Sequence, residues 1–271
     1  MGGTIATQRL GKHRVNSVAK ILAWPLLLLA LAYVLACGFL YAAQASFLYH
    51  PTAARPGDAA SRFLLHRDGI DLMVSSRDRD GPQAVLYFGG NAEDVTDSLP
   101  ELASTFPDSA IYALHYRGYG GSGGSPTERD LVSDGRALFD VIHRTHPQVT
   151  VIGRSLGSGV ALQVAAARPA SRLVLVTPYD SIAALASQRF TLFPVNWLLR
   201  DRYESWRYAP RISVPTTVIA AGNDQVIPRA STERLLAKFR PGLASYIVIS
   251  GVGHNDISAN TRYAAALRGG H

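Results

Sequence analysis

The residue most suited to chemistry is Ser155, which lies in the segment Gly153-Arg154-Ser155-Leu156-Gly157. The β-branched apolar run Val149–Ile152 precedes it, and a stretch rich in Gly and Ala with helical spacing follows it. A G-x-S-x-G segment between a strand and a helix forms a sharp turn that presents the serine hydroxyl above the edge of a sheet. The pattern alone also fits a glycine-rich turn with an incidental serine, so the residues around it must decide.

A serine hydroxyl needs a base to act as a nucleophile, so a histidine is required nearby. Of the eight histidines, His254 is the best placed, because it lies in the glycine-containing loop Ser250–Asp256 after the apolar run Tyr246–Ile249. We predict that His254 is the base. The alternative is that it only caps the final helix.

The base in turn needs a carboxylate that fixes its tautomer and stabilises the imidazolium. Asp224 directly follows the apolar run Thr216–Ala221, and Asp180, which follows the run Arg172–Val176, is the rival acid. The chain order Ser155, Asp224, His254 is the order that accompanies strand-to-helix elbows of this kind, and it differs from the orders of other serine-protease folds. We therefore predict Asp224 as the orienting acid.

A negatively charged tetrahedral intermediate also needs hydrogen-bond donors. The first predicted donor is the backbone N–H of Leu156, the residue after the nucleophile. The second is predicted in the loop Phe88-Gly89-Gly90-Asn91-Ala92, with the Asn91 N–H favoured and the Gly90 N–H as the alternative. A tight turn that begins a helix would have the same glycines.

Six short apolar runs alternate with stretches of helical periodicity, which is typical of a parallel sheet covered by helices on both faces. A hairpin precedes them, so eight strands are expected. The predicted strands are Arg62–His66, Ile70–Ser75, Ala84–Phe88, Ala110–Leu114, Val149–Ile152, Arg172–Val176, Thr216–Ala221 and Tyr246–Ile249. The predicted helices are Leu131–His143, Val160–Ala167 and Ser231–Phe239. Between the last two lies a small cap, about residues 180–213, with short helices over Ser181–Arg189 and Asn196–Arg202.

The N-terminal part contains the uncharged run Ile21–Ala43, whose 23 residues are enough to cross a bilayer core of roughly 30 Å. Four basic residues precede it, and the first acidic residue is Asp58. This distribution predicts a cytosolic tail over residues 1–20, a transmembrane anchor over 21–43, an extended connection from Gln44 and an exported domain over 44–271. A cleaved signal peptide is the alternative, because Ala43-Gln44-Ala45 resembles a cleavage site.

More than half of the net charge of +7 comes from the four basic residues before the apolar run, which set the orientation of the run in a membrane. Without these four residues the rest of the chain carries +3. Nucleic acid is therefore not an expected partner. The one cysteine, Cys37, lies inside the apolar run, which excludes an intrachain disulfide or a thiolate zinc cluster. No metal or organic cofactor is implied, and no feature indicates an oligomeric state. Arginine greatly outnumbers lysine, which hints at a GC-rich bacterial genome and a periplasmic location.

Taken together, the motifs resemble those of membrane-anchored α/β-hydrolases of the small-cap branch, which includes protein depalmitoylases and related bacterial hydrolases. The matching segments are Gln44–Pro51, Phe88–Ala92, Tyr116–Gly123, Gly153–Gly157, Ala221–Asp224 and Gly253–Asp256. The family often has His-Gly where this chain has Gly89-Gly90 and again where it has Ala221-Gly222. A histidine side chain that could support the oxyanion loop is therefore missing.

The resemblance implies a serine hydrolase that cleaves carboxylic esters or thioesters through an acyl-enzyme on Ser155. Lipid-like or acylated substrates are expected near a membrane anchor. Two alternatives remain: a peptidase-type hydrolase of the same fold, and a non-catalytic anchored protein that binds a partner or lipid. Four residues are weaker candidates for the substrate pocket, namely Arg154, Tyr116, Phe193 and Trp197. Arg154 equally fits a structural ion pair, and the cap residues equally fit packing against the domain.

Overall fold

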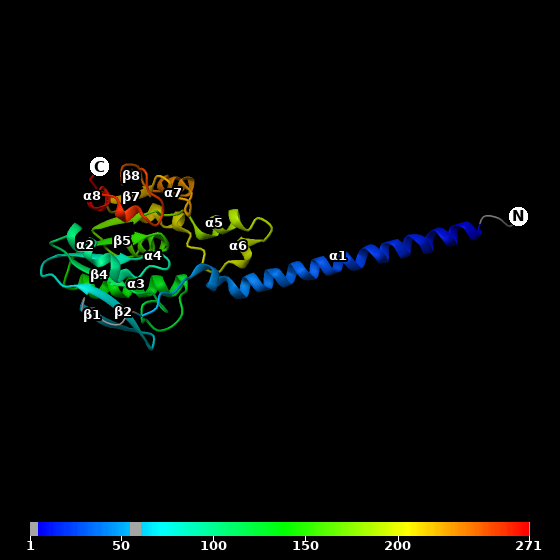
Figure 1. Cartoon of the computed structure of the whole chain (residues 1–271), viewed down its shortest axis with the longest axis horizontal. Coiled ribbons are helices and arrows are strands. Elements are labelled where there is room, and N and C mark those ends of the chain that lie inside the picture. The colour runs from blue at the N-terminus through cyan, green and yellow to red at the C-terminus, as the bar shows by residue number, and fades with distance from the viewer. Residues whose placement is uncertain (1–4, 55–60, 271) are drawn as a thin grey trace. The chain divides into compact units, whose positions relative to one another are not determined.

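The computed structural model describes the backbone of residues 5–54 and 61–270, and the side chains of residues 23–54 and 62–270. The chain divides into two compact units after Gln44 (Figure 1). The first unit consists of most of helix α1 (Ile5–Leu48), and the second contains all of the strands.

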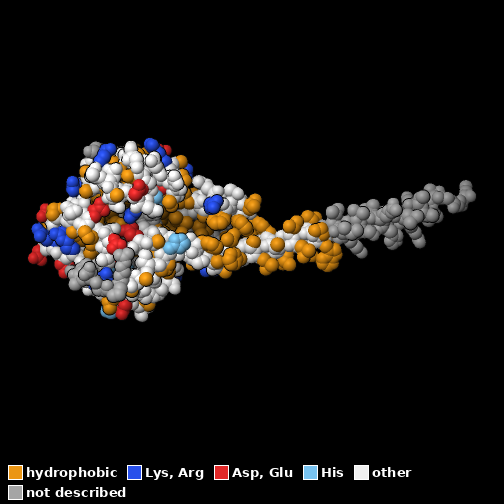
Figure 2. Space-filling view, viewed as in Figure 1, with side chains coloured by type: hydrophobic (Ala, Val, Ile, Leu, Met, Phe, Trp, Pro, Cys, Tyr) orange, Lys and Arg blue, Asp and Glu red, His pale blue; other side chains and the backbone are white. Residues whose placement is uncertain are grey.

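Helix α1 contains a stretch of 26 residues, Ala23–Leu48, that is long and apolar enough to cross a membrane. Its described side chains are almost all hydrophobic (Figure 2). A membrane span and an N-terminal signal sequence both have these properties. The extended connection predicted from Gln44 is wrong at its start, because the helix continues through Leu48 and the Tyr49 N–H donates to the Ala45 carbonyl at 2.8 Å. Pro51 follows shortly after, and it has no N–H to donate to a further helical hydrogen bond.

The second unit is built on an eight-stranded sheet with the order β1-β2-β4-β3-β5-β6-β7-β8. The strands are β1 (Ser61–Arg67), β2 (Ile70–Arg77), β3 (Gln83–Phe88), β4 (Ala110–Leu114), β5 (Gln148–Arg154), β6 (Arg172–Val176), β7 (Thr216–Ala221) and β8 (Ala244–Ile249). Strand β2 is antiparallel to β1 and to β4, and every other neighbouring pair is parallel. The predicted α/β-hydrolase fold is confirmed.

Apolar side chains from the two faces of the sheet form two cores. On β3, Ala84, Leu86 and Phe88 belong to one core, while Val85 and Tyr87 belong to the other. This alternation is the two-residue period of a strand, and burial of both faces explains why the central strands read as continuous apolar runs.

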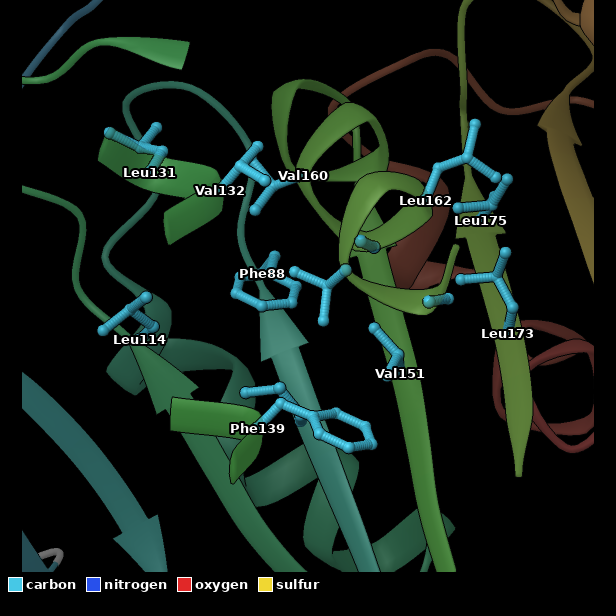
Figure 3. Packing of buried hydrophobic residues seen from close by; sticks show 14 of the residues in the cluster. Phe88, Leu114, Leu131, Val132, Phe139, Val151, Val160, Leu162, Leu173 and Leu175 are labelled. Atoms are coloured by element: carbon cyan, nitrogen blue, oxygen red, sulfur yellow. The ribbon is translucent and has the colours of Figure 1, made fainter. Parts of the chain in front are cut away.

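Helices cover both faces of the sheet. The first core is closed by α3 (Glu128–His143), α4 (Leu156–Ala165) and α7 (Arg229–Leu236), and the second by α2 (Leu99–Thr105) and α8 (Tyr263–Arg268). Figure 3 shows Phe139 of α3 and Val160 of α4 packed beside Phe88 and Val151 of the sheet. The described part of the chain also contains four short 3-10 turns: η1 (Val95–Ser98), η2 (Ser205–Arg207), η3 (Ala209–Arg211) and η4 (Ile257–Ala259).

The cap between β6 and β7 contains α5 (Ile182–Arg189) and α6 (Val195–Leu198). The helix predicted over Asn196–Arg202 is wrong beyond Leu198. Leu199 leaves the helical conformation with a ψ of 124°. The segment beyond it is held by α3, where the Glu128 carboxylate accepts the N–H groups of Arg202 and Tyr203 at 2.8 Å each.

The parallel strands position the candidate site. Because β3, β5, β7 and β8 run in the same direction, their carboxyl ends lie at one edge of the sheet, where ligands bind in open α/β folds. The segments that directly follow these four strands contain all of the residues predicted for the chemistry, from Gly90 to His254, with Leu156 as the first residue of α4.

Candidate functional site

Ser155 lies in a strained turn between β5 and α4. Its φ is +49° and its ψ is −117°, a backbone conformation that costs a non-glycine residue energy and is found mainly at functional sites. The turn is fixed by its main chain: the Ser155 N–H donates to the Val176 carbonyl at 2.9 Å, and the Ser155 carbonyl accepts the Ser158 N–H at 2.9 Å.

Gly153 and Gly157, on either side of Ser155, lie where there is no room for a Cβ atom. A Cβ atom at Gly157 would lie 2.1 Å from the Phe88 carbonyl oxygen, and one at Gly153 would lie 2.3 Å from the Gly157 carbonyl oxygen. Glycine thus lets the start of α4 approach the end of β3. This approach brings the loop after β3 against the serine.

The structure brings together the three residues predicted for a nucleophile, a base and an acid. His254 Nε2 lies 2.8 Å from Ser155 Oγ, and His254 Nδ1 lies 2.8 Å from Asp224 Oδ2. The His254 and Asp224 side chains are only 8% and 5% exposed, so water competes little for their hydrogen bond. The final helix α8 begins at Tyr263, well beyond His254, so His254 does not cap it.

Asp224 is held in its ionised form. Burial acts to raise the pKa of its carboxyl, but the hydrogen bonds from His254 and from the N–H groups of Ile227 and Val226 outweigh it and bring the pKa below its usual range. The rival acid Asp180 is engaged elsewhere, because it accepts bonds from Ser231 Oγ and Arg234 Nε at 2.6 Å each.

The loop after β3 lines the space beside Ser155, and its two candidate N–H groups differ in their hydrogen bonds. The Gly90 N–H, the alternative donor in the sequence prediction, donates to Glu93 Oε2 at 2.6 Å and is therefore occupied. Among the described residues, the Asn91 N–H has no hydrogen-bond partner. The Leu156 N–H is the first of α4, and the N–H groups of a first helical turn have no partner within their helix.

Glu93 is a residue of the site that the sequence analysis did not predict. Besides the Gly90 N–H, its carboxylate accepts hydrogen bonds from Tyr87 and Ser98 and lies 3.5 Å from Arg154. The available signal was the spacing, because a Glu three residues after a loop residue can reach back to the N–H of that residue, as the Glu of a capping box does. The Glu93 carboxylate therefore supports this loop, where the related family often has a histidine.

Arg154 forms the structural ion pair that the sequence allowed. Its guanidinium contacts Glu93 and also donates to the carbonyls of His254 and Asn255, at 3.4 and 3.1 Å. Burial alone would lower its pKa, but Glu93 and neighbouring tyrosines raise it overall. Arg154 thus links the loop after β3 to the loop that holds His254.

A cavity of about 280 Å³ opens at Ser155. Its walls are formed by Gly90, Asn91, Ala92, Glu93, Arg154, Ser155, Val226, His254 and Asn255. Of the four weaker pocket candidates, the structure brings only Arg154 there. Tyr116 is buried with its hydroxyl on the Gly89 carbonyl, Phe193 lies in the cap outside the cavity lining, and Trp197 is 88% exposed on the cap. Within residues 23–54 and 62–270, no cluster of His, Cys, Asp or Glu could hold a metal ion.

Comparison with known proteins gives one family match and many relatives. The family described as "Serine aminopeptidase, S33" matches residues 101–208, a range that contains Ser155 but not Asp224 or His254. The uncharacterized protein Rv2307c of Mycobacterium tuberculosis is 33% identical over 238 residues, which cover 80% of this chain and 83% of the relative.

Solved structures of low sequence identity share the fold. The esterase Pf2001 of Pyrococcus furiosus superposes with a TM-score of 0.62 at 15% identity, covering 81% of this chain and 94% of the esterase. The monoacylglycerol lipase of Paleococcus ferrophilus superposes with a TM-score of 0.56 at 17% identity, covering 72% of this chain and 95% of the lipase.

Proposed function

Because this chain belongs to the α/β-hydrolase superfamily, we propose that it is a serine hydrolase that cleaves carboxylic esters or thioesters through an acyl-enzyme on Ser155. The observation that supports this most strongly is the hydrogen-bonded row from Ser155 through His254 to Asp224, at 2.8 Å in both steps. An uninvolved serine in a tight turn would not need a buried, carboxylate-bound imidazole beside its hydroxyl.

In the first half of the reaction, Ser155 Oγ attacks the carbonyl carbon of the substrate and His254 Nε2 takes the hydroxyl proton. The carbonyl oxygen becomes an oxyanion, which the N–H groups of Leu156 and Asn91 stabilise. His254 then gives the proton to the leaving alcohol or thiol as its bond to the carbonyl carbon breaks. Asp224 keeps the imidazole oriented and stabilises its positive charge.

In the second half, water replaces the leaving group. His254 takes a proton from the water, whose oxygen attacks the acyl carbon, and returns the proton to Ser155 Oγ as the ester bond breaks. The carboxylic acid product leaves and the serine is restored. The chemistry needs the three side chains and two backbone donors, together with a cavity from which bulk water is partly excluded.

The substrate class follows from the location of the domain. If helix α1 is the membrane anchor that its length and composition allow, the domain lies next to the bilayer surface. The N-terminus of the chain is then in the cytosol, and the domain with its cavity lies outside. Lipid-like or acylated molecules are concentrated there, so we propose them as substrates. The esterase and lipase that share the fold are consistent with ester cleavage, although they are too distant to indicate the substrate.

A peptidase activity is the second candidate, because the matching family is described as a serine aminopeptidase. An aminopeptidase needs a carboxylate free to bind the substrate ammonium group. The one carboxylate on the described cavity wall, Glu93, already binds Arg154 and the Gly90 N–H. We therefore favour the ester.

Fluorophosphonate labelling of the full-length protein tests the proposal, with Ser155→Ala and Asp224→Asn as paired variants. The wild type should label, Ser155→Ala should not, and Asp224→Asn should label on the order of 10⁴-fold more slowly. Hydrolysis of p-nitrophenyl butyrate and of an aminoacyl p-nitroanilide then separates esterase from peptidase. A folded wild type that fails to label would refute the enzyme and favour an anchored binding protein.

A further inference from the structure

The side chain of Asn91 is bound to the segment that ends helix α1. Its Nδ2 donates to the Leu48 carbonyl at 2.7 Å, and its Oδ1 accepts the His50 N–H at 2.9 Å. Tyr119, in the loop after β4, adds a third bond from its hydroxyl to Asn91 Oδ1 at 2.8 Å. Both ends of the amide are thus used to join three segments that lie far apart in the sequence.

The segment that Asn91 binds is itself firmly held. Tyr49 is 3% exposed, and its hydroxyl donates to Asp201 Oδ2 at 2.9 Å and lies 3.0 Å from the Tyr203 hydroxyl, at the end of the cap. Further along, the Thr52 carbonyl accepts the Gly120 N–H at 2.9 Å. Residues 48–52 are therefore a fixed support and not a loose linker.

The main chain of Asn91, by contrast, has little support of its own. Its N–H has no partner among the described residues, and the hydrogen bond across the turn, from the Glu93 N–H to the Gly90 carbonyl, is long at 3.4 Å. The next residue, Ala92, has a φ of +58°, a left-handed conformation that costs a non-glycine residue energy. The turn keeps this shape only if its surroundings hold it.

From these contacts, and resting on the proposed hydrolase function, we propose that the Asn91 side chain is a positioning residue for the oxyanion donor. By binding Leu48 and His50, it fixes the orientation of its own backbone N–H toward the cavity. The segment that follows the apolar helix is thus a structural part of the oxyanion site. Correct placement of the donor then depends on residues 48–50, which lie at the end of helix α1 and directly after it.

Two substitutions at Asn91 test this in the full-length protein, because both keep the backbone N–H. Asn91→Ala removes all three side-chain bonds. Asn91→Asp keeps the acceptor for His50 but loses the donor to Leu48 and places a carboxylate against that carbonyl. Since loss of an oxyanion donor costs about 10²–10³ in kcat, and here the donor is misplaced and not deleted, both variants should lose about 10- to 100-fold in kcat on p-nitrophenyl butyrate. KM should stay within about threefold, because ground-state binding is unaffected.

A milder pair of variants keeps the test valid if the Asn91 variants do not fold. Tyr119→Phe removes only the hydroxyl that donates to Asn91 Oδ1 and accepts the His50 N–H at 2.9 Å, and it should lower kcat several-fold. Tyr112→Phe is the matched control, because its hydroxyl contacts His146 away from the cavity, and its kcat should equal that of the wild type. Melting temperature, measured for every variant, separates loss of folding from loss of positioning.

The possible results are distinct. If the wild type is active and folded Asn91→Ala and Asn91→Asp retain kcat within twofold, Asn91 has only a structural role and the inference is overturned. The same holds if KM rises while kcat stays constant. If the wild type neither labels with fluorophosphonate nor hydrolyses the ester, the proposed function itself has failed, which the labelling experiment reveals independently of Asn91.

Discussion

Gly157→Ala tests whether the fit between α4 and the end of β3 sets the rate of the reaction. The added methyl carbon would lie 2.1 Å from the Phe88 carbonyl oxygen and 2.5 Å from that of Gly89. Both atoms belong to backbone at the start of the loop that holds the Asn91 N–H. Ordinary contact of a carbon with a neighbouring heavy atom needs about 3.5 Å. The loop and the serine turn must therefore move apart by about 1 Å.

The magnitude follows from this displacement. A misplacement of 1 Å near reacting atoms can cost about 10²-fold in rate, equivalent to about 2.7 kcal/mol of transition-state stabilisation. Overpacking itself costs about 1–3 kcal/mol of stability, while alanine gains about 0.5–1 kcal/mol over glycine in a helix. We expect Gly157→Ala to lose about 100-fold in kcat but only about 1–2 kcal/mol in free energy of unfolding, so the protein stays folded.

The assay is the rate of fluorophosphonate labelling together with kcat on p-nitrophenyl butyrate, beside urea unfolding. Gly123→Ala is the matched control, because a Cβ there would meet Ile70 Cβ at an ordinary 3.5 Å and the position has no positive φ. It should keep wild-type rates. A Gly157→Ala protein that reacts at the wild-type rate would refute the reasoning, because it would show that the distance between serine and loop does not limit the reaction.

Three further substitutions follow from the same structure. Glu93→Gln leaves the Arg154 guanidinium, which is 15% exposed, without its anionic partner. Urea unfolding should therefore show a loss in free energy of unfolding on the order of 2 kcal/mol or more. An unchanged unfolding midpoint would mean that the ion pair contributes nothing to stability. Trp197→Ala should keep kcat/KM for p-nitrophenyl butyrate within threefold of the wild type, because the Trp197 side chain is 88% exposed and does not line the cavity. A larger loss would mean that the cap contacts the substrate. Burial lowers the pKa of His115 to about 4 in the folded protein, against 6.5 for an ordinary histidine, so the unfolded chain binds a proton that the folded one does not. The wild type should therefore lose up to about 3 kcal/mol of stability as the pH falls from 6.5 to 4, and His115→Gln should lack this part of the pH dependence.

The fold was predictable because its signals are local. Every predicted strand is present with ends within two residues of those expected, as at Ala110–Leu114 and Thr216–Ala221, which agree at both ends. These runs are bounded by turn residues and buried on both faces, so tertiary contacts had no reason to change them. The prediction failed beyond Leu198, where the chain leaves the helix and the distant Glu128 of α3 binds the N–H groups of Arg202 and Tyr203.

The same distinction applies to the candidate site. Ser155, Asp224 and His254 could be proposed from the sequence because each follows a strand, and the carboxyl ends of parallel strands meet at one edge. The Asn91 N–H was favoured over the Gly90 N–H, but the interaction that distinguishes them, Glu93 reaching back to the Gly90 N–H, could not be predicted. Chain order indicates which loops meet, but it does not indicate which N–H group a neighbouring side chain will occupy.

The support of the loop after β3 shows why such details escape sequence reasoning. The absence of a histidine at Gly89 suggested a loop without support, yet the structure supports it from two sides. Glu93 binds the loop from within, together with Tyr87, Ser98 and Arg154. The Asn91 side chain binds it from outside, to Leu48 and His50. A missing residue type therefore does not establish a missing support, because the carboxylate of Glu93, four residues after Gly89, can hold the loop by its own hydrogen bonds.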